Sequence, residues 1–561
     1  MHVEKNVSDN ILGTLLNLDG KTKDNLKARC DLQDIGIRHE LHPQSVDSNK
    51  IYLPPACFVM SLKDRDEFLK VLKNVKVPDG YSSNISRCIQ LKQHKITGLK
   101  SHDSHILMQQ LLVVALRGAL PKVVVAPLID LCCIFRELCS KTLNVQELER
   151  LESRSVETLC HLERIFPPSF FTIIVHLVTH LATEAKIAGP VQYRWMYPIE
   201  RFLFDLKSDV RNKAHPEGSI AEGYLVEECM TFCSRYLDSV ETIFNRPARN
   251  IDGSIGATSH IHLDQKTWMQ AHRYVLFNSN EINPFRSIHK DIIKRQKRGT
   301  RPSEAVINKI HMENFVDWFQ SYVMNSDGGK DDRFTEKIKW LAHGPNNLCR
   351  SFRGYIINGT KFRTKNYESN MKTQNSGVSV ETEGGLTYYG ILSDIIELNY
   401  YDKLRFILFK CDWADVTSNK GHKIDEFGLV LVNFSYLIHT GAKSNDEPFI
   451  LASQARQVYY IEDQRNKDWL TVVKAKPRDV FDIGSHETCE DNENSHCDNL
   501  PYNIDITSML ESLNENLDWT RDDADGTTIS EAPSHENLPL EEEYSNNSES
   551  DGDMENTCHS S

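Results

Sequence analysis

Apolar residues recur every three to four positions along most of the first 240 residues, and this spacing predicts a mainly helical region. Prolines at 54–55 and 167–168 and the Pro-Asp-Gly sequence at 78–80 mark turns between the helices. An opening helix is expected from Val7 to Leu16. The clearest apolar helices that follow are expected at Leu107–Leu116, Val123–Leu138 and Phe170–Leu181.

A further helix is expected to begin at Pro198, because proline has no N–H to leave unpaired and fits the first helical turn. Apolar residues then follow at helical spacing: Ile199, Phe202, Leu203, Leu206 and Val210. Glu200 lies in the first turn, where the positive end of the helix dipole favours a carboxylate. Read from this pattern alone, the segment is an ordinary amphipathic helix with an acidic residue at its start.

The pattern changes twice after residue 240. Residues 241–334 lack strong periodicity and read as a linker, whereas residues 335–484 carry short alternating apolar runs between polar turns. Such runs are typical of a small antiparallel β-barrel or sandwich. The strands are expected at Tyr388–Leu398, Phe406–Phe409, Leu429–Phe434, Phe449–Leu451, Gln457–Ile461 and Trp469–Val473.

The net charge of −14 is concentrated at the end of the 561-residue chain. Residues 485–561 hold 21 acidic residues against one basic residue, Arg521, while the remainder holds 64 basic and 58 acidic residues. The protein is therefore a mildly basic body with an acidic tail. The tail is rich in Asn, Ser, Asp and Glu and is predicted to be disordered, with one apolar patch, Ile504 to Leu517, that could fold on a partner.

Composition also bears on location and redox state. The sequence contains no run of 18 apolar residues, and its start lacks signal-peptide character, so we expect an intracellular protein without a membrane span. The 14 cysteines are scattered along a long chain, which favours reduced thiols with at most one metal site over a disulfide framework.

Two histidines suggest a metal site in the helical region. His176 and His180 are four residues apart, so both imidazoles share one helix face and could reach one Zn²⁺. The alternative is a pair of interior histidines with backbone or carboxylate partners, since two ligands do not complete a zinc site.

A basic run suits contact with phosphates. Six cations fall within 12 residues: Lys290, Lys294, Arg295, Lys297, Arg298 and Arg301. Such a run is typical of DNA binding or of a nuclear-import signal, and it is equally typical of a solvated helix face.

The sequence His102-Asp103-Ser104-His105 invites comparison with a hydrolase, but a catalytic triad is set by geometry in space and not by adjacency. A helix start capped by Ser101 or Asp103 explains it more simply.

Residues 189–201 read Gly-Pro-Val-Gln-Tyr-Arg-Trp-Met-Tyr-Pro-Ile-Glu-Arg, and residues 210–224 read Val-Arg-Asn-Lys-Ala-His-Pro-Glu-Gly-Ser-Ile-Ala-Glu-Gly-Tyr. Together they resemble the C-terminal part of plant CACTA (En/Spm-type) transposases. The resemblance covers roughly residues 1–485 and includes the opening Met-His-Val-Glu-Lys-Asn. It implies a ribonuclease-H-like core whose two Asp and one Glu hold divalent metals, with Glu200 matching that Glu.

On this resemblance, both catalytic Asp residues would precede Met1, so the chain would be a gene fragment or begin late. Mg²⁺ is then expected only in a complete parent transposase. Related transposases pair a His-x3-His with a Cys-x2-Cys, and the cysteines here lack that spacing, so zinc at His176 and His180 remains a hypothesis. Relatives also carry Cys at the position of Ser104, which would make 102–105 a further but incomplete source of metal ligands.

We therefore expect an α+β multidomain protein: a mostly helical N-terminal region, with a truncated ribonuclease-H-like transposase core and a helical insertion, then a small antiparallel β-domain and a disordered acidic tail. The parts are a core remnant (1–50), a helical transposase-associated domain ending in the final core helix (51–240), a basic linker (241–334), a β-rich transposase-associated domain (335–484) and the tail (485–561).

The expected function is that of a transposon-derived protein resembling the C-terminal part of a CACTA-type DNA transposase, which does not act as an enzyme on its own. Its expected partners are transposon-end DNA and other transposase subunits, and its expected location is the nucleus, otherwise the cytoplasm. The alternative is a retained, non-catalytic DNA- or chromatin-binding protein.

Overall fold

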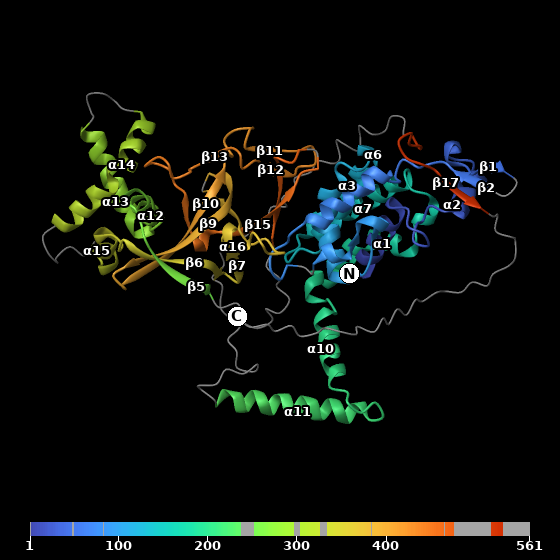
Figure 1. The fold of residues 1–561 in the computed structure, drawn as a ribbon, viewed down its shortest axis with the longest axis horizontal. Coiled ribbons are helices and arrows are strands. Elements are labelled where there is room, and N and C mark those ends of the chain that lie inside the picture. The colour runs from blue at the N-terminus through green and yellow to red at the C-terminus, as the bar shows by residue number, and fades with distance from the viewer. Residues whose placement is uncertain are drawn as a thin grey trace.

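Two lobes make up the computed structural model, one helical and one built around a sheet (Figure 1). The structure describes residues 2–47, 50–81, 84–236, 252–296, 303–325, 334–382, 384–464, 466–475 and 518–530. A mixed α+β protein with an antiparallel sheet is thereby confirmed. Within these ranges, every helix is too short or too polar to cross a membrane.

The helical lobe is held by one apolar core that runs from Val7 on the first helix to Ala185 on the ninth. Its helices are α1 (His2–Leu15), α2 (Leu26–Ile35), α3 (Leu62–Asn74), α4 (Ser101–Ile106), the π-helical turn η4 (Leu107–Leu111), α5 (Leu112–Leu116), α6 (Lys122–Leu138), α7 (Val145–Glu163), α8 (Ile173–His176) and α9 (Val178–Ala188). Its short strands are β1 (Gln44–Asp47), β2 (Lys50–Leu53), β3 (Ile89–Gln90) and β4 (Lys95–Ile96). The expected core remnant at 1–50 therefore packs as part of this lobe, because α1 buries its apolar face against α4 and α8.

Two helices leave the helical lobe and form an arm. They are α10 (Tyr197–Ser208) and α11 (Pro216–Arg235), and α10 extends away from both lobes in Figure 1. The helix expected to begin at Pro198 is confirmed, with proline in the first turn.

The second lobe is built on an antiparallel sheet in the order β11-β12-β16-β15-β8-β9-β10-β13, with β6 also paired to β9. The strands are β5 (Gly253–His262), β6 (Leu348–Ile357), β7 (Thr360–Arg363), β8 (Gly377–Glu381), β9 (Thr387–Tyr400), β10 (Leu404–Ala414), β11 (His422–Ile424), β12 (Val430–Val432), β13 (Leu437–Ile438), β14 (Phe449–Leu451), β15 (Arg456–Glu462) and β16 (Leu470–Lys474). Each of the six strands predicted from alternation corresponds to one of these, β9, β10, β12, β14, β15 and β16.

The predicted linker at 241–334 is wrong for the residues that the structure describes. Strand β5 pairs along β6, and the helices α12 (Gln265–Phe277), α13 (Asn283–Gln296), α14 (Glu304–Asn325) and α15 (Glu336–His343) follow in that region of the lobe. The short helix α16 (Lys365–Glu368) lies further along the chain. Apolar residues of α12 and α14, such as Val275 and Phe315, form one core with Ile396 and Leu408 of the sheet. The sequence hides this helical spacing because polar residues such as His272, His289 and His311 take buried positions on the inner faces of these helices.

Part of the acidic tail is also structured. Strand β17 (Thr527–Ser530) pairs antiparallel with β2, and the Arg521 guanidinium bonds to the Asp64 carboxylate at 2.7 Å. The Arg38 guanidinium stacks over Trp519, 4.6 Å from the ring centre. Predicted disorder is therefore wrong for 518–530, and the rest of the predicted disordered tail, with the apolar patch at 504–517, lies outside the described residues.

A buried arginine joins the two lobes. Arg117, at the end of α5, is 7% exposed and bonds to the carboxylates of Asp425 and Asp463, the second at 2.6 Å. It also donates to the Thr471 hydroxyl at 2.9 Å. Around it, Phe427 and other side chains of the sheet lobe complete the apolar core of the helical lobe. The lobes are therefore packed as one body.

Replacing Arg117 with Met should lower the free energy of unfolding by about 3–5 kcal/mol, because two largely buried carboxylates lose their cation. The matched control is Lys122→Met, which removes the more exposed pair with Glu426 at the same interface and should cost about 0–1 kcal/mol. Urea unfolding of both variants measures the difference. Equal losses would show that Arg117 does not hold the lobes together.

Candidate metal centre and the α10 arm

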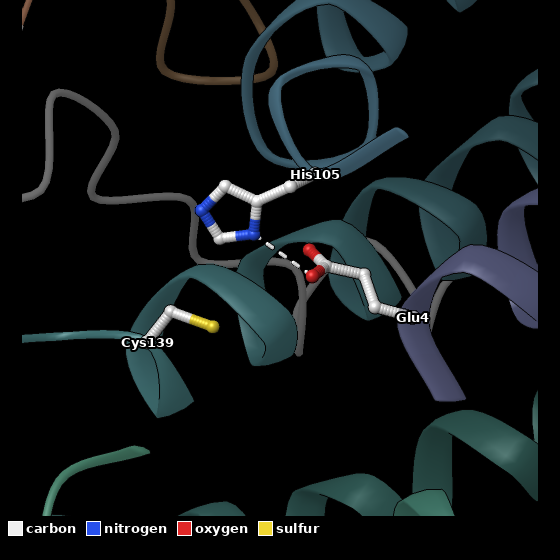
Figure 2. A group of neighbouring side chains, drawn as sticks. All are labelled: Glu4, His105 and Cys139. Atoms are coloured by element: carbon white, nitrogen blue, oxygen red, sulfur yellow. Dashed lines mark hydrogen bonds and ion pairs between the residues drawn. The ribbon is translucent and has the colours of Figure 1, made fainter. Parts of the chain in front are cut away.

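Three side chains with metal-binding chemistry converge from distant parts of the helical lobe (Figure 2). Glu4 comes from the first turn of α1, His105 from α4, and Cys139 from the residue that ends α6. One ligand atom from each lies within 4.8 Å of the other two. Within the described part of the chain, this is the one group of three or more His, Cys, Asp or Glu residues with such spacing.

Hydrogen bonds already orient two members of this cluster. The His105 Nδ1 lies 2.8 Å from Oε2 of Glu4, and the amide of Gln109 donates to Oε1 of Glu4 at 3.0 Å. Gln109 belongs to η4, where the helix widens to π-helical hydrogen bonding. Such turns are rare and occur often at functional sites. The widened turn therefore lies directly beside the cluster.

The cluster is shielded from solvent. The Glu4 carboxylate is 2% exposed and the His105 side chain 14%. Trp195 meets the His105 ring edge-on, with ring centres 5.6 Å apart. Because Trp195 lies two residues before α10, the chain that leads into the arm covers the cluster.

Two other cysteines, Cys132 and Cys133 of α6, lie in the same core. Burial strongly raises the pKa of the Cys132 thiol, and the neighbouring Cys133 and the Glu4 carboxylate add to this effect. Burial also raises the pKa of Cys133. Both therefore stay protonated near neutral pH, and the Cys133 sulfur also accepts a hydrogen bond from the Arg136 guanidinium at 3.1 Å.

Glu200, predicted to be a catalytic remnant, lies on the arm outside this cluster. Its side chain is exposed on α10, and Leu203 and Phe204, one turn further along on the same face, are 57% and 61% exposed. The face of α10 that carries Glu200 is therefore apolar and uncovered.

The predicted zinc pair is at the surface. His176 and His180 are both exposed, and their Nε2 atoms lie 3.2 Å apart. The structure thus brings the two imidazoles together, but among the described residues it adds no third ligand to them. The alternative of two interior histidines is wrong, because both rings lie on the outer face of the helix pair α8 and α9.

The described half of the basic run lies on α13. Phe285, His289 and Ile293 are buried at successive turns, which leaves Lys294 and Arg295 exposed and Lys290 half-buried. Lys297, Arg298 and Arg301 lie outside the described residues. The run is therefore partly an exposed helix face, as one reading of the sequence predicted.

The cluster at 102–105 is a helix start and not a hydrolase site. The Asp103 carboxylate accepts a hydrogen bond from the backbone N–H of Lys100 at 3.2 Å, and Ser104 is fully buried. His105 belongs instead to the cluster with Glu4 and Cys139. Sequence reasoning missed Glu4 and Cys139, since they are separated by more than 130 positions and only the packing of α1 against the lobe brings them together.

Comparison with known families gives two partial matches. Residues 138–251 match a domain of unknown function (DUF4218), and residues 396–472 match a second one (DUF4216). Both are typical of plant transposase-derived proteins. Comparison with curated proteins and with solved structures finds no match.

Acid should loosen the helix that carries the basic residues. His311 of α14 is 2% exposed and its Nδ1 lies 2.7 Å from Nδ1 of His289. Burial, together with the nearby His289, Lys290 and Arg286, lowers the pKa of His311 from 6.5 to about 3. Below pH 6.5, His311 therefore binds a proton in the unfolded chain, whereas in the folded chain it stays neutral until the pH falls to about 3.

The free energy of unfolding should fall as the pH drops through this window, by up to ~1.4 kcal/mol per pH unit for this one group. His311→Asn should reduce that slope, whereas His260→Asn, at an exposed position in the same lobe, should leave it unchanged. Urea unfolding at pH 7 and at about pH 5 tests this. The same slope in the His311 variant and the parent protein would contradict it.

Proposed function

We propose that this chain belongs to the DNA-processing machinery of a CACTA-type transposable element, in which it supplies assembly and DNA-contacting surfaces and does not cut DNA alone. The observation that carries the proposal is the uncovered apolar face of α10, which displays Glu200 inside the segment that resembles the last core helix of these transposases. The two matched domains, in the same chain, support a transposon-derived origin.

The proposed occupant of that face is the sheet of a ribonuclease-H-like core. A helix that packs on such a sheet needs an apolar stripe, and α10 carries Ile199, Phe202, Leu203 and Phe204 at exposures between 48% and 61%. Exposure of this apolar stripe to water is unfavourable. Burying each of these side chains against a sheet would contribute about 1.5–3 kcal/mol. Glu200, between Leu203 and Phe204, would then face the place where the core holds its metals.

The residues of the arm do not fit a two-metal site by themselves. Two-metal phosphoryl transfer requires carboxylates that hold ions roughly 4 Å apart. Asp205 and Asp209 follow Glu200 by five and nine residues, which places them about 140° and 180° around the helix from it. Among the described residues, no metal-capable group of three includes Glu200. We therefore derive no cleavage step for this chain, and Mg²⁺ belongs to a complete parent transposase.

Incubated alone with a transposon-end duplex in Mg²⁺, the protein should leave both strands intact, since one carboxylate cannot hold two ions. Adding a purified core segment that carries the two catalytic Asp residues of a CACTA-type transposase should restore cleavage. Glu200→Gln should abolish the restored cleavage, while Glu222→Gln, an exposed position on α11, should preserve it. Cleavage by the protein alone that depends on Glu200 would refute the proposal.

DNA contact is proposed for the outward face of α13 and the basic residues that follow it. The weak pairing of Lys294 with Glu304, 3.8 Å apart and solvent-exposed on both sides, leaves this cation available for a phosphate. Nuclear location is proposed on the same residues, because a basic run of this kind also suits an import signal.

A combined change of Lys290, Lys294 and Arg295 to Glu should weaken DNA binding and flatten its salt dependence. Each lost phosphate contact should reduce the slope of log affinity against log salt by about 0.9. Lys92→Glu, at an exposed position of the helical lobe, is the control and should change little. Binding is measured by fluorescence anisotropy over a salt series, and an unchanged slope in the triple variant would remove α13 from the interface.

The second candidate is a retained DNA- or chromatin-binding protein without a catalytic partner. The acidic tail and the basic helix α13 fit this candidate as well as they fit the first one. It predicts DNA binding that persists in Leu203→Asp, with no complex between the parent protein and the core segment in size-exclusion chromatography.

A further inference from the structure

We propose that Glu4, His105 and Cys139 bind one Zn²⁺, which ties α1 to α4 and to the end of α6. The site is independent of the transposase proposal, because it rests on side chains of the helical lobe and not on the arm's partner. It also differs in place and in ligands from the surface pair His176 and His180.

The donor set selects the metal. One imidazole nitrogen, one thiolate sulfur and one carboxylate oxygen are the three ligand types that Zn²⁺ accepts, whereas Mg²⁺ and Ca²⁺ take oxygen ligands almost alone. Ligand atoms on a tetrahedral zinc with bonds of about 2.0–2.3 Å lie roughly 3.3–3.8 Å apart. The ligand atoms of Glu4, His105 and Cys139 lie within 4.8 Å of one another, which is close to this range. A water molecule would complete the fourth position.

The burial of Glu4 calls for a cation. Its carboxylate is 2% exposed and bonds to the His105 ring and the Gln109 amide. A buried carboxylate is costly unless it is paired or bound to a metal. A divalent ion at this position would neutralise both the carboxylate and the Cys139 thiolate, with one positive ion for two negative ligands.

The surrounding residues are arranged as a second shell. Gln109 donates to the Oε1 atom of Glu4 and thereby holds the carboxylate in place, as outer residues do at metal sites. It can take that position because η4 widens the helix between α4 and α5. Trp195 covers the His105 ring and limits solvent access. The π-helical turn is an observation independent of the three ligands, and it points to the same place.

Zinc binding would also fix the segment at Trp195, from which the arm begins. Trp195 packs on the His105 ring, and α10 begins two residues later. An ion that immobilises the His105 ring therefore also restricts Trp195 and the start of α10. The inferred role of the zinc is thus structural: it sets the direction in which the arm leaves the helical lobe.

The test uses the full chain, purified without a polyhistidine tag, stripped with chelator and reloaded with Zn²⁺ or Co²⁺. Elemental analysis should find about one zinc per chain in the parent protein. Cys139→Ser and His105→Ala should bind none after dialysis, whereas Cys160→Ser, which removes an exposed thiol of α7, should retain it. Gln109→Ala should weaken zinc binding by about 10–100-fold.

Cobalt distinguishes this site from the histidine pair, and because the band is read in the parent protein it does not depend on whether the Cys139 and His105 variants fold. Co²⁺ bound to the parent protein through Cys139 gives a thiolate-to-metal charge-transfer band in the near ultraviolet, and binding through His176 and His180 gives none. The band in the parent protein and in a His176→Ala variant supports the proposal. Absence of stoichiometric metal, absence of the band, or loss of the metal in His176→Ala overturns it.

Discussion

The buried guanidinium of Arg117 imposes the constraint on which the arrangement of the two lobes depends. A cation that is 7% exposed must be matched by carboxylates, and Asp425 and Asp463 of the sheet lobe supply them. The apolar core of the helical lobe continues into Phe427 and Tyr459, so the sheet lobe also completes that core. The two matched domains lie on opposite sides of this junction, and each is expected to need the other for a fully buried core.

Elsewhere in the molecule, the apolar faces of some helices are buried and those of others are exposed. The sheet lobe covers one face of its strands with α12 and α14, and their apolar residues are buried. The arm differs, because its apolar residues are not buried: Phe204 and Val226, for example, are about 61% exposed. This apolar surface next to a carboxylate fits the docking role proposed for the arm, and the Trp195 contact with His105 fixes where the arm starts.

Local patterns in the sequence were sufficient for elements whose burial is regular along the chain. Strand β9 is rich in apolar and β-branched residues and was readable as a strand, as was the helix that begins beside Pro198. The helices α12–α14 were missed because polar residues, among them His272, His289 and His311, take buried positions on their inner faces and interrupt the apolar spacing. Glu4 and Cys139 could not be found at all, because nothing local relates a glutamate in the first turn of the chain to a thiol at the end of α6.

The acidic tail illustrates why composition alone misled. Its charge predicts disorder, yet the stretch 518–530 combines Trp519, which Arg38 covers, with Arg521, which Asp64 and Asp523 pair. Backbone pairing between β17 and β2 then adds a strand to an otherwise open edge. Because β17 and α13 lie at opposite ends of the molecule in Figure 1, the aspartates of this docked stretch are held far from the basic helix.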